Sequence, residues 1–175
     1  MSKRQRFLKA KNYALFYGAD RSSELSNFDV AIVEPLGQNN ESLEILHKAG
    51  TLVLAYLSVM EVHQNSNDFH LVDENDFLRI DGTPLKNKTY GTYILNPAAK
   101  TWSRLLYHNA GKLLLHNGYD GLFLDTIDAA ELSGLPPGTR KMLVHSIVEY
   151  IRQLRKLDDD FIIVQNNGVE RVCLH

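Results

Sequence analysis

Five short apolar runs recur along the chain, and each is rich in β-branched or aromatic residues. None alternates cleanly between apolar and polar positions. Such runs are typical of strands buried on both faces of a parallel sheet rather than of strands with one face in water. The predicted strands cover residues 13–17, 30–33, 51–57, 121–124 and 161–164.

Helical patterns lie between most of these strands. The first covers residues 40–49, where leucines recur on one side and Gly50 ends the pattern. The second begins at Asn96-Pro97, a capping side chain followed by a proline suited to the first helical position, and ends at Asn117-Gly118. The third begins at Pro136-Pro137 and ends at Lys156. Strands that alternate with helices predict an α/β fold with a parallel sheet, and we expect residues 1–175 to form a single domain.

The longest stretch without periodicity covers residues 60–90. It is polar and interrupted by asparagines and by Asp81-Gly82. A loop of this length inside a compact domain is usually functional or disordered, so the sequence predicts a long irregular segment here.

Composition excludes several classes of protein. Lys and Arg number 19 against 21 Asp and Glu, a net charge of -2 that does not favour nucleic-acid binding. The one cysteine, Cys173, excludes an intramolecular disulfide framework. No run reaches the roughly 18 apolar residues of a membrane span. Residues 1–11 are basic but lack the apolar stretch of a secretory signal, so the chain as written is expected to be cytoplasmic.

Polar side chains follow every predicted strand, and the carboxyl ends of parallel strands meet at one edge of the sheet, where such folds bind ligands. Several carboxylates gathered there, with amides and tyrosines beside them, suit a sugar site. Glycoside cleavage needs one carboxyl group to protonate the leaving oxygen and a second to attack, to activate water or to stabilise positive charge. The candidate residues are Tyr17, Glu34, Tyr56, Glu61, Asp125, Asp128 and Asn166.

Each acidic candidate also has a plain structural interpretation. Asp125 and Asp128 are in positions that suit turn or capping residues, and Glu61 is in one that suits an exposed ion pair. A metal-dependent hydrolase is an alternative function, because His63 and His70 share their segment with two aspartates. No recognised ligand spacing supports that alternative, so we expect exposed histidines there and neither a metal nor another cofactor.

Residues 118–128, Gly-Tyr-Asp-Gly-Leu-Phe-Leu-Asp-Thr-Ile-Asp, resemble a sequence block of glycoside hydrolase family 114. That family includes endo-α-1,4-polygalactosaminidase-like and spherulin-4-like proteins. Further resemblances follow in the family's order along nearly the whole chain, at residues 17–33, 54–61, 96–102 and 162–168.

The resemblance implies a (β/α)8 TIM barrel that hydrolyses an α-1,4-linked, galactosamine-containing polysaccharide. Asp125 matches the family's acidic residue on the fourth strand and takes the role of a nucleophile-type carboxylate. Glu61 matches the glutamate of the third-strand block and is carried over as a second site residue. Met60 stands where the family usually has glycine, so its larger side chain is expected to crowd that rim of the site.

The chain departs from the family in length. A complete barrel takes about 250 residues, so we expect this one to be truncated after about five parallel strands. The family's second catalytic carboxylate is expected on a later strand, and nothing gives Glu170 that role. Hydrolysis impaired by truncation and a non-catalytic carbohydrate-binding or structural remnant are therefore both open. Exposed sheet edges favour a homo-oligomer or a partner chain, and the resemblance leaves secretion open.

Overall fold

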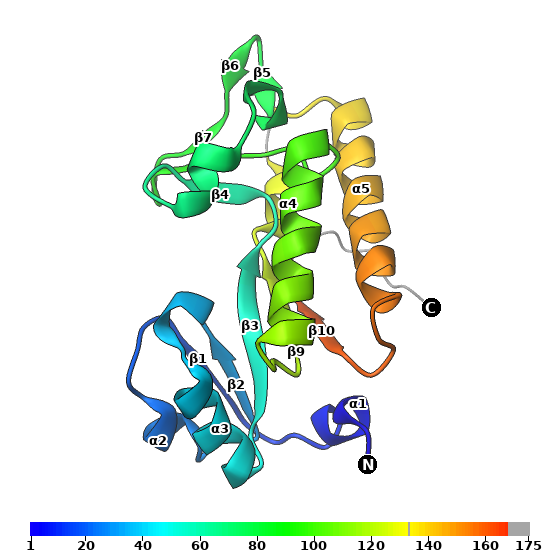
Figure 1. Ribbon diagram of the computed structural model, residues 1–175. Helices are drawn as coiled ribbons and strands as arrows, with labels where there is room; N and C mark the ends of the chain where they lie inside the picture. The colour runs from blue at the N-terminus through cyan, green and yellow to red at the C-terminus, as the bar shows by residue number, and fades with distance from the viewer. Residues whose placement is uncertain (133, 168–175) are drawn as a thin grey trace. The chain divides into compact units, whose positions relative to one another are not determined.

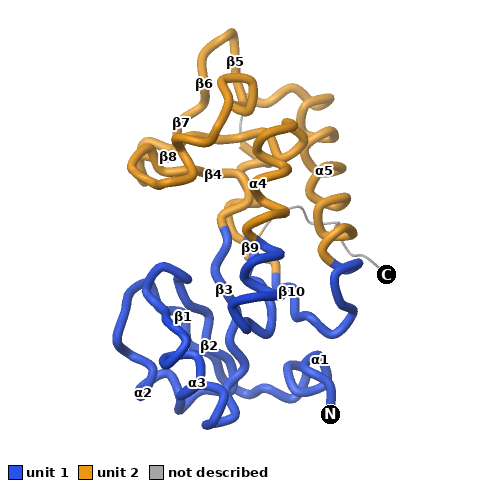
Figure 2. The backbone as a smooth tube through the Cα atoms, in the orientation of Figure 1, with its two compact units in different colours: residues 1–57, 110–124, 155–164 blue, residues 58–109, 125–154, 165–175 orange. Residues whose placement is uncertain are grey.

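The computed structural model describes residues 1–132 and 134–167 (Figure 1), so Gly168, Glu170 and Cys173 lie outside the described residues. Contacts within the chain divide it into two compact units, drawn in different colours in Figure 2. The first unit comprises residues 1–57, 110–124 and 155–164, and the second comprises residues 58–109, 125–154 and 165–175.

A five-stranded parallel sheet is the centre of the first unit (Figure 1). Its spatial order among the described strands is the same as their order along the chain. A sheet wound in one direction, without reversal, has the topology of a barrel rather than of a doubly wound sheet, as predicted. The strands are β1 (Tyr13–Phe16), β2 (Val30–Val33), β3 (Leu52–Ser58), β9 (Gly121–Asp125) and β10 (Ile162–Gln165).

Burial differs between the middle and the edge of this sheet. All residues of β2 are buried, and β3 and β9 are buried along most of their length, as predicted. The prediction is wrong for β1, where Tyr13 is 69% and Leu15 43% exposed. The reason is topological, because β1 has one neighbouring strand among the described residues and therefore forms an edge.

Apolar side chains from neighbouring strands form the core of the first unit. The buried members are Val30, Ile32, Leu52, Leu54, Phe123 and Ile162. Gly121, at the start of β9, lets β10 approach closely, since a Cβ there would lie 2.0 Å from the carbonyl oxygen of Ile162.

Helical segments connect the strands of the first unit. Helix α3 matches its predicted range, because the Asn39 side chain caps its start and Gly50, in the left-handed conformation with φ 89°, ends it. Two short helices, α1 and α2, were not predicted. The segments are α1 (Lys3–Phe7), α2 (Ser22–Leu25), the 3-10 turn η1 (Pro35–Gly37), α3 (Asn40–Ala49) and the π-helical turn η4 (Lys112–His116).

The segment predicted to be a long irregular loop is folded, and we call residues 61–94 the excursion. It contains an antiparallel three-stranded sheet of order β4-β8-β7 and a two-stranded pair, β5 and β6. Strands of two or three residues leave no periodicity in a sequence, which is why the prediction was wrong. The elements are β4 (Glu61–His63), η2 (Asn67–Leu71), η3 (Glu74–Asp76), β5 (Arg79–Ile80), β6 (Thr83–Pro84), β7 (Lys86–Asn87) and β8 (Thr92–Ile94).

Two long helices complete the second unit, α4 (Lys100–Gly111) and α5 (Pro137–Arg155), with the 3-10 turn η5 (Ile127–Glu131) before α5. They lie side by side in Figure 1, and the hydroxyl of Tyr150 donates to the carbonyl of Leu106 at 3.2 Å. Helix α4 begins later than predicted, because Asn96 accepts from the Ala98 amide at 2.9 Å and forms a turn before the helix.

Candidate functional site

Asp125 is the last residue of β9, and Asn166 follows β10, the next strand in the sheet. The Asn166 side-chain amide donates to Asp125 Oδ1 at 2.8 Å, and both residues are half-buried. The structure therefore brings these two predicted site residues together, and the amide fixes the orientation of the carboxylate.

Glu61 is the first residue of β4, in the excursion. Its two carboxylate oxygens accept from side chains on the two other strands of the same sheet. The amide of Asn87 on β7 donates to Oε1 at 3.1 Å, and the hydroxyl of Thr92 on β8 donates to Oε2 at 2.5 Å. These two partners could not be predicted from the sequence, because their contacts depend on antiparallel pairing that leaves no periodic signal.

Hydrogen bonds connect the surroundings of Glu61 with those of Asp125. The amide of Val59 donates to the carbonyl of Asp125 at 3.0 Å. The hydroxyl of Ser58 donates to the carbonyl of Glu61 at 2.7 Å and lies 3.0 Å from the Thr126 hydroxyl. Asp125, Asn166 and Glu61 thus belong to one hydrogen-bonded set in the second unit, which we call the carboxylate set.

Two other predictions concern the same unit. Asp128 lies in η5 and is exposed, so both its functional and its capping interpretations stay predictions. Met60 was expected to crowd the rim of the site. That expectation is wrong, because Met60 is 0% exposed and its side chain is packed inside the protein.

Three candidates belong to the first unit. Tyr17 follows β1 and is 56% exposed, and its ring meets that of Tyr56 edge-on at 5.2 Å between centroids. Glu34 follows β2 and is half-buried. Burial raises the pKa of the Glu34 carboxyl, and a hydrogen bond with the Leu36 backbone partly offsets this. Burial, together with the nearby charge of Glu34, raises the pKa of Tyr119 to about 12.

His63 and His70 are exposed. Within residues 1–132 and 134–167, no three His, Cys, Asp or Glu side chains are arranged to hold a metal ion. The helices in the same ranges include none long and apolar enough to span a membrane.

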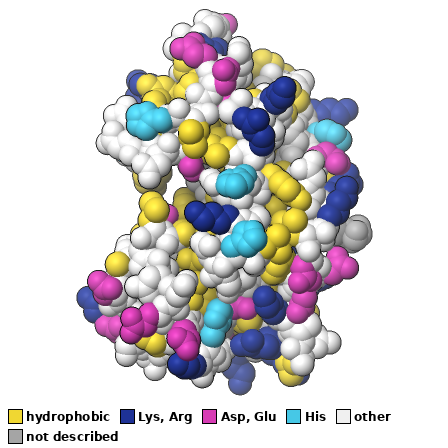
Figure 3. All heavy atoms as spheres, in the orientation of Figure 1, with side chains coloured by type: hydrophobic (Ala, Val, Ile, Leu, Met, Phe, Trp, Pro, Cys, Tyr) yellow, Lys and Arg dark blue, Asp and Glu magenta, His cyan; other side chains and the backbone are white. Residues whose placement is uncertain are grey.

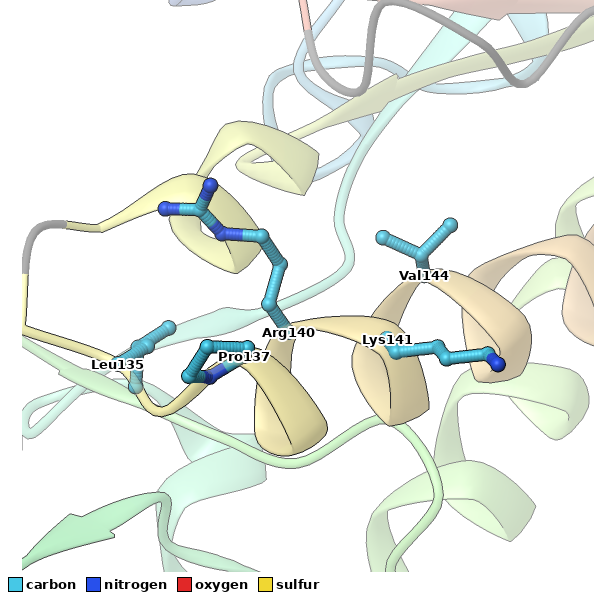
Figure 4. Close-up of a pocket in the computed structure, with 5 residues that line it drawn as sticks. All are labelled: Leu135, Pro137, Arg140, Lys141 and Val144. Atoms are coloured by element: carbon cyan, nitrogen blue, oxygen red, sulfur yellow. The ribbon is translucent and has the colours of Figure 1, made fainter.

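Two surface hollows lie away from the candidate residues. One, of about 400 Å³, is at the start of α5 in the second unit, lined by Leu135, Pro137, Arg140, Lys141 and Val144 (Figure 4). The other, of about 620 Å³, is in the first unit between α3 and the segment around Asn117. None of the predicted site residues lines either hollow.

A parallel sheet wound in chain order, with polar side chains meeting beyond adjacent strands, places the chain in the TIM-barrel class of folds. The chain matches the family model described as glycoside-hydrolase family GH114 over residues 3–174, and it belongs to that family. The family resemblance found in the sequence is thereby confirmed.

Solved structures share this fold. The glycoside hydrolase domain of PelA from Pseudomonas aeruginosa has a TM-score of 0.74 at 23% identity, over 91% of this chain and 60% of that one. Aspergillus fumigatus Ega3 in complex with galactosamine has a TM-score of 0.63 at 16% identity, over 88% of this chain and 58% of that one.

A curated relative, the uncharacterized protein MJ1477 of Methanocaldococcus jannaschii, is 27% identical over 138 residues, covering 74% of this chain. The chain spans 38% of the length of that relative and about 60% of the length of the PelA domain.

Proposed function

We propose that the chain is a glycoside hydrolase that acts on an α-1,4-linked, galactosamine-containing polysaccharide, with Asp125 as its nucleophile-type carboxylate. The observation that carries this proposal is the hydrogen bond from Asn166 to Asp125 at the carboxyl end of β9, in a chain of family GH114. A carboxylate held in this way can attack the sugar or activate a water molecule, as glycoside cleavage requires.

Glu61 is the second carboxylate of the proposal. Donors from Asn87 and Thr92 fix both of its oxygens in place, and each oxygen keeps a lone pair for a donor on the substrate. The ammonium group of a galactosamine residue is a donor of that kind. The galactosamine in the Ega3 structure supports this choice of sugar. Tyr17, Glu34, Tyr56, Asp128 and Asn166 are proposed to bind the substrate.

The test uses the purified chain and de-N-acetylated galactosaminogalactan, with mass spectrometry of the released oligosaccharides. We expect Asp125→Asn to lower kcat by about 10²–10⁴-fold, because a neutral amide can neither attack nor act as a base. Circular dichroism checks that the variant is folded. Glu149→Gln, which removes an exposed carboxylate on α5 that pairs with Arg152, is the control and should leave turnover unchanged.

Turnover that persists in Asp125→Asn would overturn the role of this residue. A carbohydrate-binding function is the second candidate, because a Glu61 carboxylate held by two donors can bind a sugar ammonium group without cleaving the substrate. It predicts that galactosamine oligosaccharides raise the Tm of the wild type while no product forms, which would replace hydrolysis as the function.

A further inference from the structure

Thr126, the residue after Asp125, has an unusual backbone conformation. Its φ of 63° and ψ of 15° place it in the left-handed region. A β-branched side chain is rarely found there, since its Cβ crowds the following carbonyl group. Such strained positions persist where the surrounding structure holds them, and they gather at functional sites.

The Thr126 hydroxyl has an unusual set of partners. Thr126 precedes η5 at the position where threonine commonly caps a helix, yet its side chain makes no capping bond to that turn. Its Oγ1 instead accepts from the backbone amides of Val59 at 3.2 Å and Met60 at 2.9 Å. The hydroxyl also donates to the carbonyl of Asp125 at 2.7 Å.

These contacts join two segments of the second unit that are far apart in the sequence. Val59 and Met60 form the turn between β3 and Glu61, whereas Asp125 ends β9. Ser58 Oγ lies 3.0 Å from Thr126 Oγ1 and donates to the carbonyl of Glu61. One threonine hydroxyl is therefore bonded to the backbone of Asp125 and to both residues of the turn that leads into Glu61.

We propose that Thr126 is a positioning residue, whose hydroxyl holds Asp125 in register with the turn that carries Glu61. Its role in the reaction rests on the proposed function. Glycine or asparagine would adopt the left-handed conformation with less strain, but neither supplies a hydroxyl at this place. The strained threonine is thus explained by the bonds that its side chain makes.

The test compares Thr126→Val, which keeps the shape and removes the hydroxyl, with Thr126→Ser, which keeps the hydroxyl. Amide hydrogen exchange measured by NMR gives a readout that does not depend on activity. We expect Thr126→Val to speed exchange at Met60 by about tenfold, since this amide loses its acceptor, and Thr126→Ser to restore protection. The Val59 amide keeps the carbonyl of Asp125 as an acceptor and should change less. Thr126→Gly, which tolerates the left-handed conformation and has no side-chain acceptor, replaces the valine variant if that variant does not fold.

Kinetics give the second readout. In Thr126→Val we expect kcat to fall by about tenfold or more with KM little changed, because misplacing a reacting group slows the chemical step, and Thr126→Ser to recover most of it. Ser146→Ala is the matched control. It also removes a hydroxyl bonded to a backbone carbonyl, that of Met142, but on the exposed side of α5, so both readouts should stay at wild-type values.

Three outcomes decide the matter. A Met60 amide that stays protected without the Thr126 hydroxyl would overturn the proposal, as would a serine variant that recovers neither readout. If the wild type itself releases no product, the proposed function fails. The positioning role then stands or falls on exchange alone, and lost protection in Thr126→Val that returns in Thr126→Ser supports it.

Discussion

Asp120, just before β9, is a buried carboxylate with three partners in the first unit. It is 6% exposed, accepts from the Val53 amide at 2.9 Å and from His47 Nε2 at 3.0 Å, and lies 3.5 Å from the Lys3 ammonium. Burial by itself would raise the pKa of Asp120. The hydrogen bonds from His47 and Val53 and the charges of His47 and Lys3 outweigh burial, so this pKa lies below its usual value.

The lowered pKa predicts a pH-dependent contribution to stability. A carboxyl whose folded pKa is below the unfolded value of about 3.9 stabilises the fold above that pH, and the contribution disappears as pH falls through the folded pKa. We expect Asp120→Asn to lower the free energy of unfolding at pH 7 by about 1–3 kcal/mol. The difference from wild type should shrink below about pH 4.

Urea unfolding at pH 7, 5 and 3 measures this difference. Glu149→Gln is the control, because an exposed charge should change stability by less than about 0.5 kcal/mol at each pH. A difference between Asp120→Asn and wild type that stays constant from pH 7 to pH 3 would contradict the prediction.

The sequence was informative about single residues where a residue's position in a strand decides its surroundings. Asp125 and Asn166 could be placed at the same edge of the sheet in advance, since the carboxyl ends of parallel strands meet there. Asn87, Thr92 and Thr126 could not be identified as partners of the carboxylate set. Their contacts depend on antiparallel pairing in the excursion and on one left-handed residue, and neither leaves a signal in a single sequence.

Among the helices, too, some ends could be predicted from the sequence and others could not. The range of α3 was predicted because its capping residue and its terminal glycine are both visible in the sequence. The start of α4 was misplaced, because Asn96-Pro97 forms a turn before the helix although its composition suits a helix start. The excursion was missed altogether, since its strands are too short to show a period.

Replacing glycine by alanine should have opposite effects on stability at two positions in the first unit. Gly50 has φ 89°, a conformation that costs an alanine about 1–2 kcal/mol. Gly111, at the end of α4, has helical φ and ψ of -59° and -42°, and an alanine methyl group there would meet no neighbouring atom within 4 Å.

We therefore expect Gly50→Ala to destabilise the protein by about 1 kcal/mol and Gly111→Ala to stabilise it by about 0.5–1 kcal/mol. Urea unfolding of the two variants and the wild type gives the comparison, and each variant serves as the other's control. Changes of the same sign would show that local backbone conformation does not govern these positions.

Charged side chains of both signs lie on the face of the molecule drawn in Figure 3. Lys and Arg side chains are interspersed there with Asp and Glu side chains, in line with a net charge of -2. The more distinctive surface feature is β1, which has one neighbour among the described strands and exposes Tyr13 and Leu15. An apolar edge strand is a template for pairing with another chain.

We therefore expect the protein to self-associate through β1 as its concentration rises. Leu15→Lys should weaken association by about tenfold or more, because lysine on an edge opposes pairing and an apolar contact worth about 1.5–3 kcal/mol is lost. Sedimentation velocity over a range of concentrations measures this. Met142→Lys, at a helix residue with similar exposure of 40%, is the control. A wild type that sediments as a monomer at every concentration would contradict the prediction.

The excursion has a consequence for how such proteins diversify. Glu61, Asn87 and Thr92 all lie within one uninterrupted stretch of chain. A single recombination event that exchanges this stretch between related genes would transplant the acid together with both of its donors. The three residues would therefore be inherited together, and these two hydrogen bonds would need no compensating mutation in another part of the chain.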